Sequence, residues 1–244
     1  MVHTHKFCIE GVGMSPNYDS RDFYFLNYLF EATAKTYFNY DLTAYQLQEE
    51  GKSWIITDLF FEYLAKPLMW NETFEVKVAF RETKGLRVAC DLEVFHHDKK
   101  IAQSTMQWVV IDVNTRRPVI HPKVAQRLPI TEGLPYEGYR YPKLKNVDTP
   151  TGVEFPITYS LIDFNHHLNS YHYFRMAYDA LPLDFIEQRY PTTLQVKFVK
   201  EIRLGDKARI YASLNEEKTD IQINQVHNDE ENLACKMQVE WKKR

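Results

Sequence analysis

The sequence predicts an α+β fold built from two tandem copies of one module, in which a long helix packs against an antiparallel sheet. Two observations predict it. Each half of the 244 residues has the pattern of a helix followed by short alternating strands, and short stretches recur between the halves. A single module of this kind leaves a sheet edge open, and pairing two modules covers that edge.

The first half of the chain predicts a helix followed by an antiparallel meander. A strand is expected over residues 5–13. Apolar residues at steps of three and four predict a helix over residues 23–40, and a second helical segment spans 44–50 and stops at Gly51. Strands rich in apolar and aromatic residues are then predicted at residues 55–57, 60–61, 74–80, 87–95 and 101–113.

The second half repeats this order after a connector. Residues 114–150 are rich in proline and carry little periodicity, so they predict an irregular segment that packs on the surface. After it, strands are predicted at 155–161, 194–198, 208–214, 221–227 and 233–241, with helices at 169–181 and 184–190. The expected boundaries are an N-terminal module over 1–125, a connector over 126–150 and a C-terminal module over 151–244.

Internal similarity supports a duplication. Residues 66–72 match residues 200–206, and Met106-Gln107 matches Met237-Gln238 at nearly the same offset. The matches keep their order in the two halves, which a duplicated module requires. A long helix wrapped by an antiparallel sheet is the hot dog arrangement, so the sequence predicts a double hot dog.

Composition excludes several classes of protein. A hydrophobic content of 44% excludes a disordered chain, and a count of 8 glycines argues against Gly-rich phosphate-binding folds. The net charge of −3 gives no global attraction to nucleic acid or an anionic membrane, and no apolar run reaches the roughly 18 residues of a membrane helix. The three cysteines form no Cys-x-x-Cys motif and no secretory signal is visible, so we expect a cytoplasmic protein without disulfides or a metal site.

The densest polar cluster lies at residues 163–170, just before the second long helix. Helix capping explains one or two of these side chains, because Asp and Asn are good N-caps. It does not explain five polar side chains in seven positions. A helix start also supplies N–H donors for an oxyanion, while Asn adds a donor and His moves protons near neutral pH. The clustering therefore favours a catalytic site.

This cluster resembles a family motif. Asp163-x-Asn165-x-His167-x-Asn169, followed by Tyr173, is similar to the motif of plant and bacterial acyl-acyl carrier protein (acyl-ACP) thioesterases. Two further stretches agree with that resemblance. They are residues 108–124, similar to the family's end of the first hot dog, and residues 200–206, similar to the segment that holds its catalytic glutamate.

The resemblance implies a thioester hydrolase without cofactors. Its implied reaction is hydrolysis of fatty acyl-ACP, which releases free fatty acid and ends chain elongation. Asp163, Asn165, His167 and Glu201 match the family's catalytic set, in which plant members carry a cysteine directly after the glutamate. Ile202 occupies that position here and cannot attack a thioester, so water is the expected nucleophile unless a different cysteine has been recruited. Cys8, Cys90 and Cys235 lie in predicted strands and are interpreted as buried structural thiols.

The first half carries no copy of this polar cluster, so we expect one active site per chain. The side chains predicted to bind substrate are Asn169 near the site and Phe23, Leu26, Phe30 and Trp70, which would line an acyl tunnel. For any single one of these apolar residues, ordinary core packing is the simpler interpretation. The side chains predicted to bind acidic ACP are Arg116, Arg117, Lys200 and Arg203, from two basic clusters at residues 114–147 and 197–209.

Other functions stay open at this point. An acyl-CoA thioesterase on the same scaffold would need a nucleotide site in place of a protein-docking surface. A non-catalytic acyl-binding module would bind without turnover, and a hot dog dehydratase is disfavoured because the polar cluster suits hydrolysis better. Neither nucleic acid nor membrane is expected as a partner, and a homodimer is compatible with the sequence.

Overall fold

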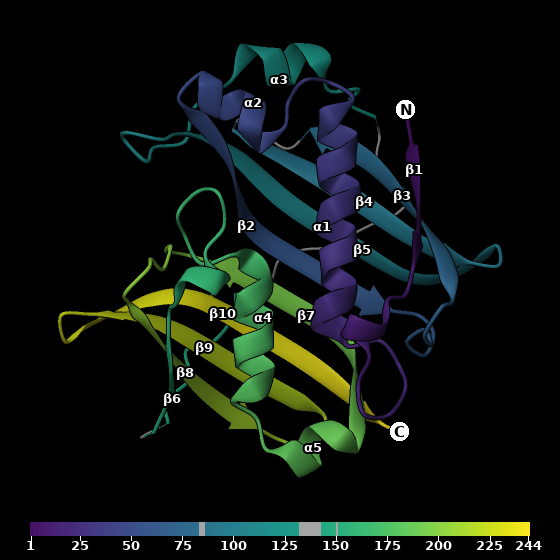
Figure 1. The fold of residues 1–244 in the computed structure, drawn as a ribbon, viewed down its shortest axis with the longest axis vertical. Helices are drawn as coiled ribbons and strands as arrows, with labels where there is room; N and C mark the ends of the chain where they lie inside the picture. The colour runs from purple at the N-terminus through teal and green to yellow at the C-terminus, as the bar shows by residue number, and fades with distance from the viewer. Residues whose placement is uncertain (83–85, 132–142, 150) are drawn as a thin grey trace. The chain divides into compact units, whose positions relative to one another are not determined.

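The computed structural model describes residues 1–82, 86–131, 143–149 and 151–244, and it divides into two compact units, Met1–Arg140 and Tyr141–Arg244 (Figure 1). We call these the N-terminal unit and the C-terminal unit. Each has its own long helix lying across an antiparallel sheet. The module boundaries predicted at residues 125 and 151 stay a prediction.

In its described residues, the N-terminal unit has one long helix, shorter helices and five strands. Its elements are β1 (His3–Cys8), η1 (Gly11–Gly13), α1 (Asp22–Phe38), α2 (Ala44–Glu49), β2 (Lys52–Tyr63), β3 (Thr73–Glu82), β4 (Arg87–His96), β5 (Lys99–Asp112) and α3 (Pro122–Arg127). The strands pair antiparallel in the order β1-β3-β4-β5-β2. The helix predicted over residues 23–40 is therefore confirmed as α1.

Helix α1 is held on its sheet by an aromatic core. Phe25 and Leu26 are fully buried, and the Phe25 ring lies 5.2 Å from Phe74 on β3. Near the C-terminal end of the helix, the Tyr37 ring stacks 4.7 Å from Trp54 on β2. Full burial of such side chains stabilises the fold by about 1.5–3 kcal/mol each, so the apolar face of α1 determines which way the helix packs.

The C-terminal unit repeats the same order of elements. They are β6 (Val153–Pro156), η2 (Tyr159–Leu161), α4 (Ser170–Asp179), α5 (Leu183–Glu187), β7 (Arg189–Phe198), β8 (Lys207–Leu214), β9 (Lys218–His227) and β10 (Glu230–Lys243). Its strands pair in the order β6-β8-β9-β10-β7, which corresponds strand for strand to the N-terminal unit. The predicted fold of two tandem helix-on-sheet modules is confirmed.

Several predicted element boundaries are wrong. The strands predicted at 5–13 and 155–161 both end early, at Cys8 and Pro156, and a single 3₁₀ turn follows each. The strands predicted at 55–57 and 60–61 are one strand, β2, with a bulge between Ile56 and Asp58. A bulge shifts the alternation of buried residues by one position, which broke the period-two pattern in the sequence.

Helix α3 was not predicted, because its six residues show no apolar periodicity. Pro122 occupies the first turn, where a missing N–H costs nothing, and Val124 is buried beneath it. Between Ile130 and Phe80 a parallel bridge ties the next residues to the sheet of the N-terminal unit. None of the helices in the described residues is both long enough and apolar enough to cross a membrane.

Candidate active site

The polar cluster forms a closed loop between η2 and α4. Ile162 and Leu168 form an antiparallel bridge across its base, and the Asp163 N–H donates to the His167 carbonyl at 2.9 Å. The chain reverses at His166, whose φ of 62° lies in the left-handed region. These contacts fix the backbone on both sides of His167.

Asp163 organises this loop through its carboxylate. Its Oδ1 accepts a hydrogen bond from the Asn165 N–H at 2.8 Å, as in an Asx turn. Burial raises the pKa of Asp163, and the backbone hydrogen bonds of Asn165 and His167 partly offset that rise. The structure therefore supports a role for Asp163 in shaping the loop that presents His167.

Glu201 lies on the segment between β7 and β8, directly opposite this loop. The Leu168 N–H donates to the Ile202 carbonyl at 2.8 Å, and His167 forms an antiparallel bridge with Arg203. From helix α4, the Tyr173 hydroxyl donates to the Lys200 carbonyl at 3.4 Å. The two neighbours of Glu201 in the sequence are thus both tied to the loop or the helix.

The structure brings His167 and Glu201 together. His167 Nε2 lies 3.0 Å from Glu201 Oε2, and the side chains are 14% and 33% exposed. A carboxylate paired with an imidazole and still reachable by solvent can orient a water molecule and take its proton. The pair lies beside the start of α4, because His167 comes only two residues before the N-cap Asn169.

The two asparagines have different positions. Asn169 caps α4, since its Oδ1 accepts from the Tyr171 N–H at 3.0 Å, and capping accounts for that contact. Asn165 is placed through its backbone N–H, which Asp163 accepts. The predicted oxyanion contact of Asn165 and the predicted substrate contact of Asn169 stay predictions.

Ile202 occupies the place where a cysteine would follow the glutamate, and it is fully buried. Cys90 and Cys235 are also buried, and burial raises the pKa of both thiols, so neither favours the thiolate form that attacks a thioester. The third, Cys8, is half-buried on β1, and its Sγ lies 3.5 Å from Asn71 Oδ1. The prediction that each thiol is buried holds for two of the three.

The N-terminal unit contains a backbone copy of the catalytic loop, which sequence analysis missed. The Ser15 N–H donates to the Asp19 carbonyl at 2.8 Å, the Ser20 N–H donates to the Leu68 carbonyl at 2.7 Å, and Tyr18 turns the chain with a φ of 64°. These contacts correspond one by one to those of residues 163–168. The signal in the sequence was a shared asparagine, which is Asn17 in this loop and Asn165 in the other.

The side chains of the copy cannot reproduce the pair of His167 and Glu201. Asp19 stands at the position of His167, and Pro67 stands at the position of Glu201. A proline has no side-chain acceptor, so this loop has no base at the corresponding place. The expectation of one active site per chain stays a prediction.

Comparison with known proteins shows which family the C-terminal part of the chain resembles. Residues 144–243 match the sequence profile of the acyl-ACP thioesterase C-terminal domain, and these residues contain the whole loop 163–168 and Glu201. This part of the chain is therefore similar to the acyl-ACP thioesterases. A comparison of the sequence with curated proteins finds no match.

Solved structures show the same fold over the whole chain. An acyl-ACP thioesterase from Bacteroides thetaiotaomicron superposes with a TM-score of 0.85 at 20% identity, covering 99% of this chain and 98% of its own. The 12:0-ACP thioesterase from Umbellularia californica gives a TM-score of 0.86 at 14% identity, covering 100% of this chain and 98% of its own. The tandem hot dog fold predicted from the sequence is thereby confirmed.

The residues predicted to line an acyl tunnel do not share one environment. Leu26 is fully buried, Phe23 is half-buried, and Phe30 is half-buried with its ring edge-on to Trp108 at 6.3 Å. Trp70 is 66% exposed. It lines a cavity of about 460 Å³ whose lining residues are Gly11, Met14, Tyr18, Met69 and Trp70.

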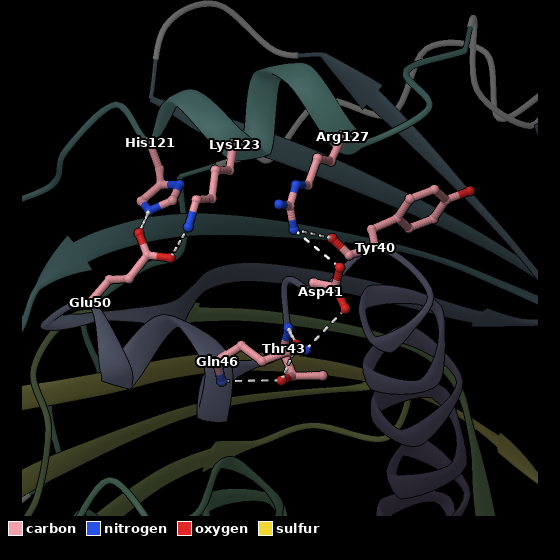
Figure 2. Close-up of polar contacts among 8 residues, drawn as sticks. All are labelled: Tyr40, Asp41, Thr43, Gln46, Glu50, His121, Lys123 and Arg127. Atoms are coloured by element: carbon pink, nitrogen blue, oxygen red, sulfur yellow. Dashed lines mark hydrogen bonds and ion pairs between the residues drawn. The ribbon is translucent and has the colours of Figure 1, made fainter.

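The first basic cluster is partly neutralised within the N-terminal unit. Figure 2 shows Lys123 and His121 pointing at the carboxylate of Glu50, while Arg127 lies 3.3 Å from Asp41. Arg140, Glu132 and Glu137 of the predicted cluster lie outside the described residues. Arg116 lies in the turn after β5 with a φ of 58°, and Arg117 beside it is exposed.

The second basic cluster surrounds Glu201. Lys207 and Arg209 both pair with Glu154, so their charges are compensated locally. Lys200 and Arg203 are exposed on either side of Glu201 in the sequence. Of the four residues predicted to bind ACP, these two lie at the catalytic pair.

Proposed function

We propose that this thioesterase hydrolyses fatty acyl-ACP, releasing free fatty acid and ending chain elongation. The observation that carries the proposal is the pair formed by His167 Nε2 and Glu201 Oε2 at 3.0 Å, beside the start of α4. The family match over residues 144–243 supports the same reaction. Cytoplasmic location and a homodimer stay predictions.

In the proposed mechanism, Glu201 orients a water molecule and takes its proton as the water oxygen attacks the thioester carbonyl carbon. His167 shares that proton and delivers it to the departing sulfur as the C–S bond breaks, so the products are a carboxylic acid and a thiol. Such general-base assistance contributes about 10²–10⁴-fold to the rate. With Ile202 after Glu201, no covalent acyl-enzyme is required.

The start of α4 supports the second part of the mechanism. Backbone N–H groups there and the Asn165 side chain would stabilise the oxyanion as negative charge develops on the carbonyl oxygen. Asp163 would act indirectly, by holding the Asn165 backbone at 2.8 Å. In this proposal, Asn169 caps α4 and also contacts the substrate.

Substrate would be bound through two further surfaces. Lys200 and Arg203 would attract acidic ACP, and the exposed side chains of Phe164 and Leu204 lie in the same two segments as the catalytic pair. A surface that mixes basic and apolar side chains suits a partner that is acidic with apolar patches. The acyl chain would be bound by Phe23, Leu26, Phe30 and Trp70.

The experiment is an assay of thiol release on acyl-ACPs and acyl-CoAs of graded chain length. Wild type should turn over acyl-ACP, and Glu201→Gln, which keeps the shape but removes the base, should lower kcat by about 10²–10⁴-fold with little change in KM. The matched control is Glu230→Gln, an exposed carboxylate of the same unit, which should behave as wild type.

Three outcomes would contradict the proposal. Faster turnover of acyl-CoA than of acyl-ACP would favour the alternative acyl-CoA thioesterase. Tight binding of acyl-ACP without any thiol release would favour a non-catalytic acyl-binding module. Near-normal kcat in Glu201→Gln would show that Glu201 is structural, and the base would then have to be His167 or Asp163.

A further inference from the structure

The turn that follows Glu201 is held by one buried carboxylate. Asp206 Oδ2 accepts the Arg203 N–H at 2.9 Å and the side-chain amide of Gln225. Its Oδ1 accepts from His227 Nδ1 at 2.7 Å. Gln225 and His227 both belong to β9, so Asp206 links the turn carrying Glu201 to the sheet.

This carboxylate is both buried and ionised. The Asp206 side chain is 3% exposed, and burial alone would raise its pKa. The hydrogen bonds from Gln225, the Arg203 N–H and His227 outweigh burial and lower the pKa of Asp206 below its ordinary value. A buried carboxylate that accepts from three donors holds those groups in place, because removing it leaves the donors unsatisfied.

The contact with Arg203 connects Asp206 to the catalytic pair. Arg203 lies two residues after Glu201, and its backbone forms the antiparallel bridge with His167. Any movement of the Arg203 backbone would therefore shift Glu201 relative to the His167 imidazole. We propose that Asp206 is a positioning residue of the hydrolase, which holds Glu201 within hydrogen-bond reach of His167. The inference rests on the proposed function, in which this pair activates water.

The N-terminal unit supplies a natural control for this arrangement. In the matching turn, Glu72 Oε2 accepts the Met69 N–H at 2.7 Å, and its other oxygen lies 3.6 Å from His96 Nε2. This turn has the same backbone contacts but carries Pro67 where Glu201 would be. Glu72 thus performs the structural half of the role of Asp206 with no catalytic group to position.

The matching turn of the N-terminal unit also indicates which substitution of Asp206 should preserve hydrolysis. Since a glutamate caps the matching turn, Asp206→Glu should cap the catalytic turn and restore most of the activity. Asp206→Asn keeps the size of the side chain but loses the charge and one acceptor. The Glu72 side chain is 37% exposed, so its loss should cost less stability than loss of Asp206.

The test compares Asp206→Asn, Asp206→Glu and Glu72→Gln with wild type, well below the Tm of each variant. Asp206→Asn should lower kcat for acyl-ACP by about 10–100-fold with KM nearly unchanged, because a misplacement of the order of 1 Å has effects of this size. Asp206→Glu should recover most of kcat, and Glu72→Gln should leave it unchanged. Normal kcat in folded Asp206→Asn, or equal losses in Asp206→Asn and Glu72→Gln, would overturn the inference.

A second readout does not depend on turnover. In wild type, Asp206→Asn and Glu72→Gln, the imidazole resonances of His167 are recorded by NMR at constant pH. They should shift in Asp206→Asn, because Glu201 moves from the ring, and stay in place in Glu72→Gln. Unmoved resonances in Asp206→Asn overturn the positioning role even if the chain shows no hydrolase activity. If wild type shows no hydrolysis but the His167 resonances shift in Asp206→Asn, only the proposed function is overturned.

Discussion

At the scale of single residues, the pair of His167 and Glu201 is positioned by backbone contacts. His167 and Arg203 face each other as a backbone bridge, and the Leu168 N–H holds the Ile202 carbonyl. The segments are therefore fixed before the side chains of His167 and Glu201 meet, which lowers the entropy lost in ordering that pair. The same backbone frame in the N-terminal unit holds Asp19 and Pro67 at these places, so the two units differ in the side chains and not in the backbone.

Because His167 and Glu201 share one proton in the proposed mechanism, their substitutions should not be additive. His167→Ala should lower kcat by about as much as Glu201→Gln, and the double variant should be little worse than either single variant. Steady-state kinetics on one acyl-ACP measures all three. A double variant whose loss equals the product of the single losses would show that the two residues act independently.

The three thiols should be dispensable. Cys90 and Cys235 are buried with raised pKa values, and Cys8 lies on β1 of the N-terminal unit, whereas the catalytic pair lies in the C-terminal unit. Replacing all three by serine should leave most of kcat intact, provided circular dichroism shows a folded protein. Loss of activity by several orders of magnitude in the folded triple variant would exclude water as the nucleophile.

At the scale of elements, α3 shows how a short helix is fixed without a large apolar face. One end is tied by His121 and Lys123 to Glu50, the C-cap residue directly after α2, and the other end is tied by Arg127 to Asp41 after α1 (Figure 2). Isolated surface ion pairs contribute little each, but pairs at both ends restrain the helix cooperatively.

This arrangement predicts a pH-dependent contribution of Glu50 to stability. The hydrogen bond from Lys123 lowers the pKa of Glu50. Desolvation opposes that shift, and the charge of Lys123 and the contact with His121 lower the pKa further. A lowered carboxylate pKa stabilises the fold above the unfolded value of 4.5, and that stabilisation is lost as pH falls through the folded value.

Thermal unfolding of wild type and Glu50→Gln measures that contribution. The difference in Tm should be present at pH 7 and should close below pH 4.5, the ordinary value for this carboxyl. Glu49→Gln is the matched control, since Glu49 is the exposed neighbour of Glu50 on α2, and its Tm should follow wild type throughout. A difference that stays constant with pH would exclude the ion pairs as its cause.

The elements show what a sequence can predict and what it cannot. Long periodic segments such as α1 and the strands of both sheets were predicted, because burial of one face imposes a period on many residues. Helix α3 and the 3₁₀ turns were not, because their contacts come from residues distant in the sequence, such as Glu50 and Lys123. The residues proposed for catalysis were predicted by resemblance, while the role proposed for Asp206 depends on its contacts with β9, which the sequence does not show.

At the scale of the whole chain, duplication has produced two equivalent loops with different contents. The C-terminal unit keeps a histidine and a glutamate in contact, and the N-terminal unit has Asp19 and Pro67 at the same places. Both loops keep their backbone hydrogen bonds and their left-handed turn residue. The backbone of the loop is therefore common to both modules, whereas the histidine–glutamate pair is found in one of them.

The net charge of −3 means that an acidic partner must be attracted locally. Lys200 and Arg203 flank Glu201 and are exposed, whereas Lys123 and Arg127 of the other cluster are already paired with carboxylates. Reversing both charges, as Lys200→Glu with Arg203→Glu, should raise KM for acyl-ACP strongly. Reversing Arg116 and Arg117 to glutamate changes the net charge equally and should have a smaller effect.

Two measurements separate docking from damage to the site. A small acyl thioester without a carrier protein should be hydrolysed by the Lys200/Arg203 variant with nearly the wild-type kcat/KM, because that substrate needs no basic surface. The defect with acyl-ACP should also shrink as ionic strength rises, since the Debye length falls from about 10 Å at 0.1 M salt to about 3 Å at 1 M. Equal losses on both substrates would mean that the reversed charges disturb Glu201 itself. A larger defect in the Arg116/Arg117 variant would instead indicate that ACP docks on the N-terminal unit.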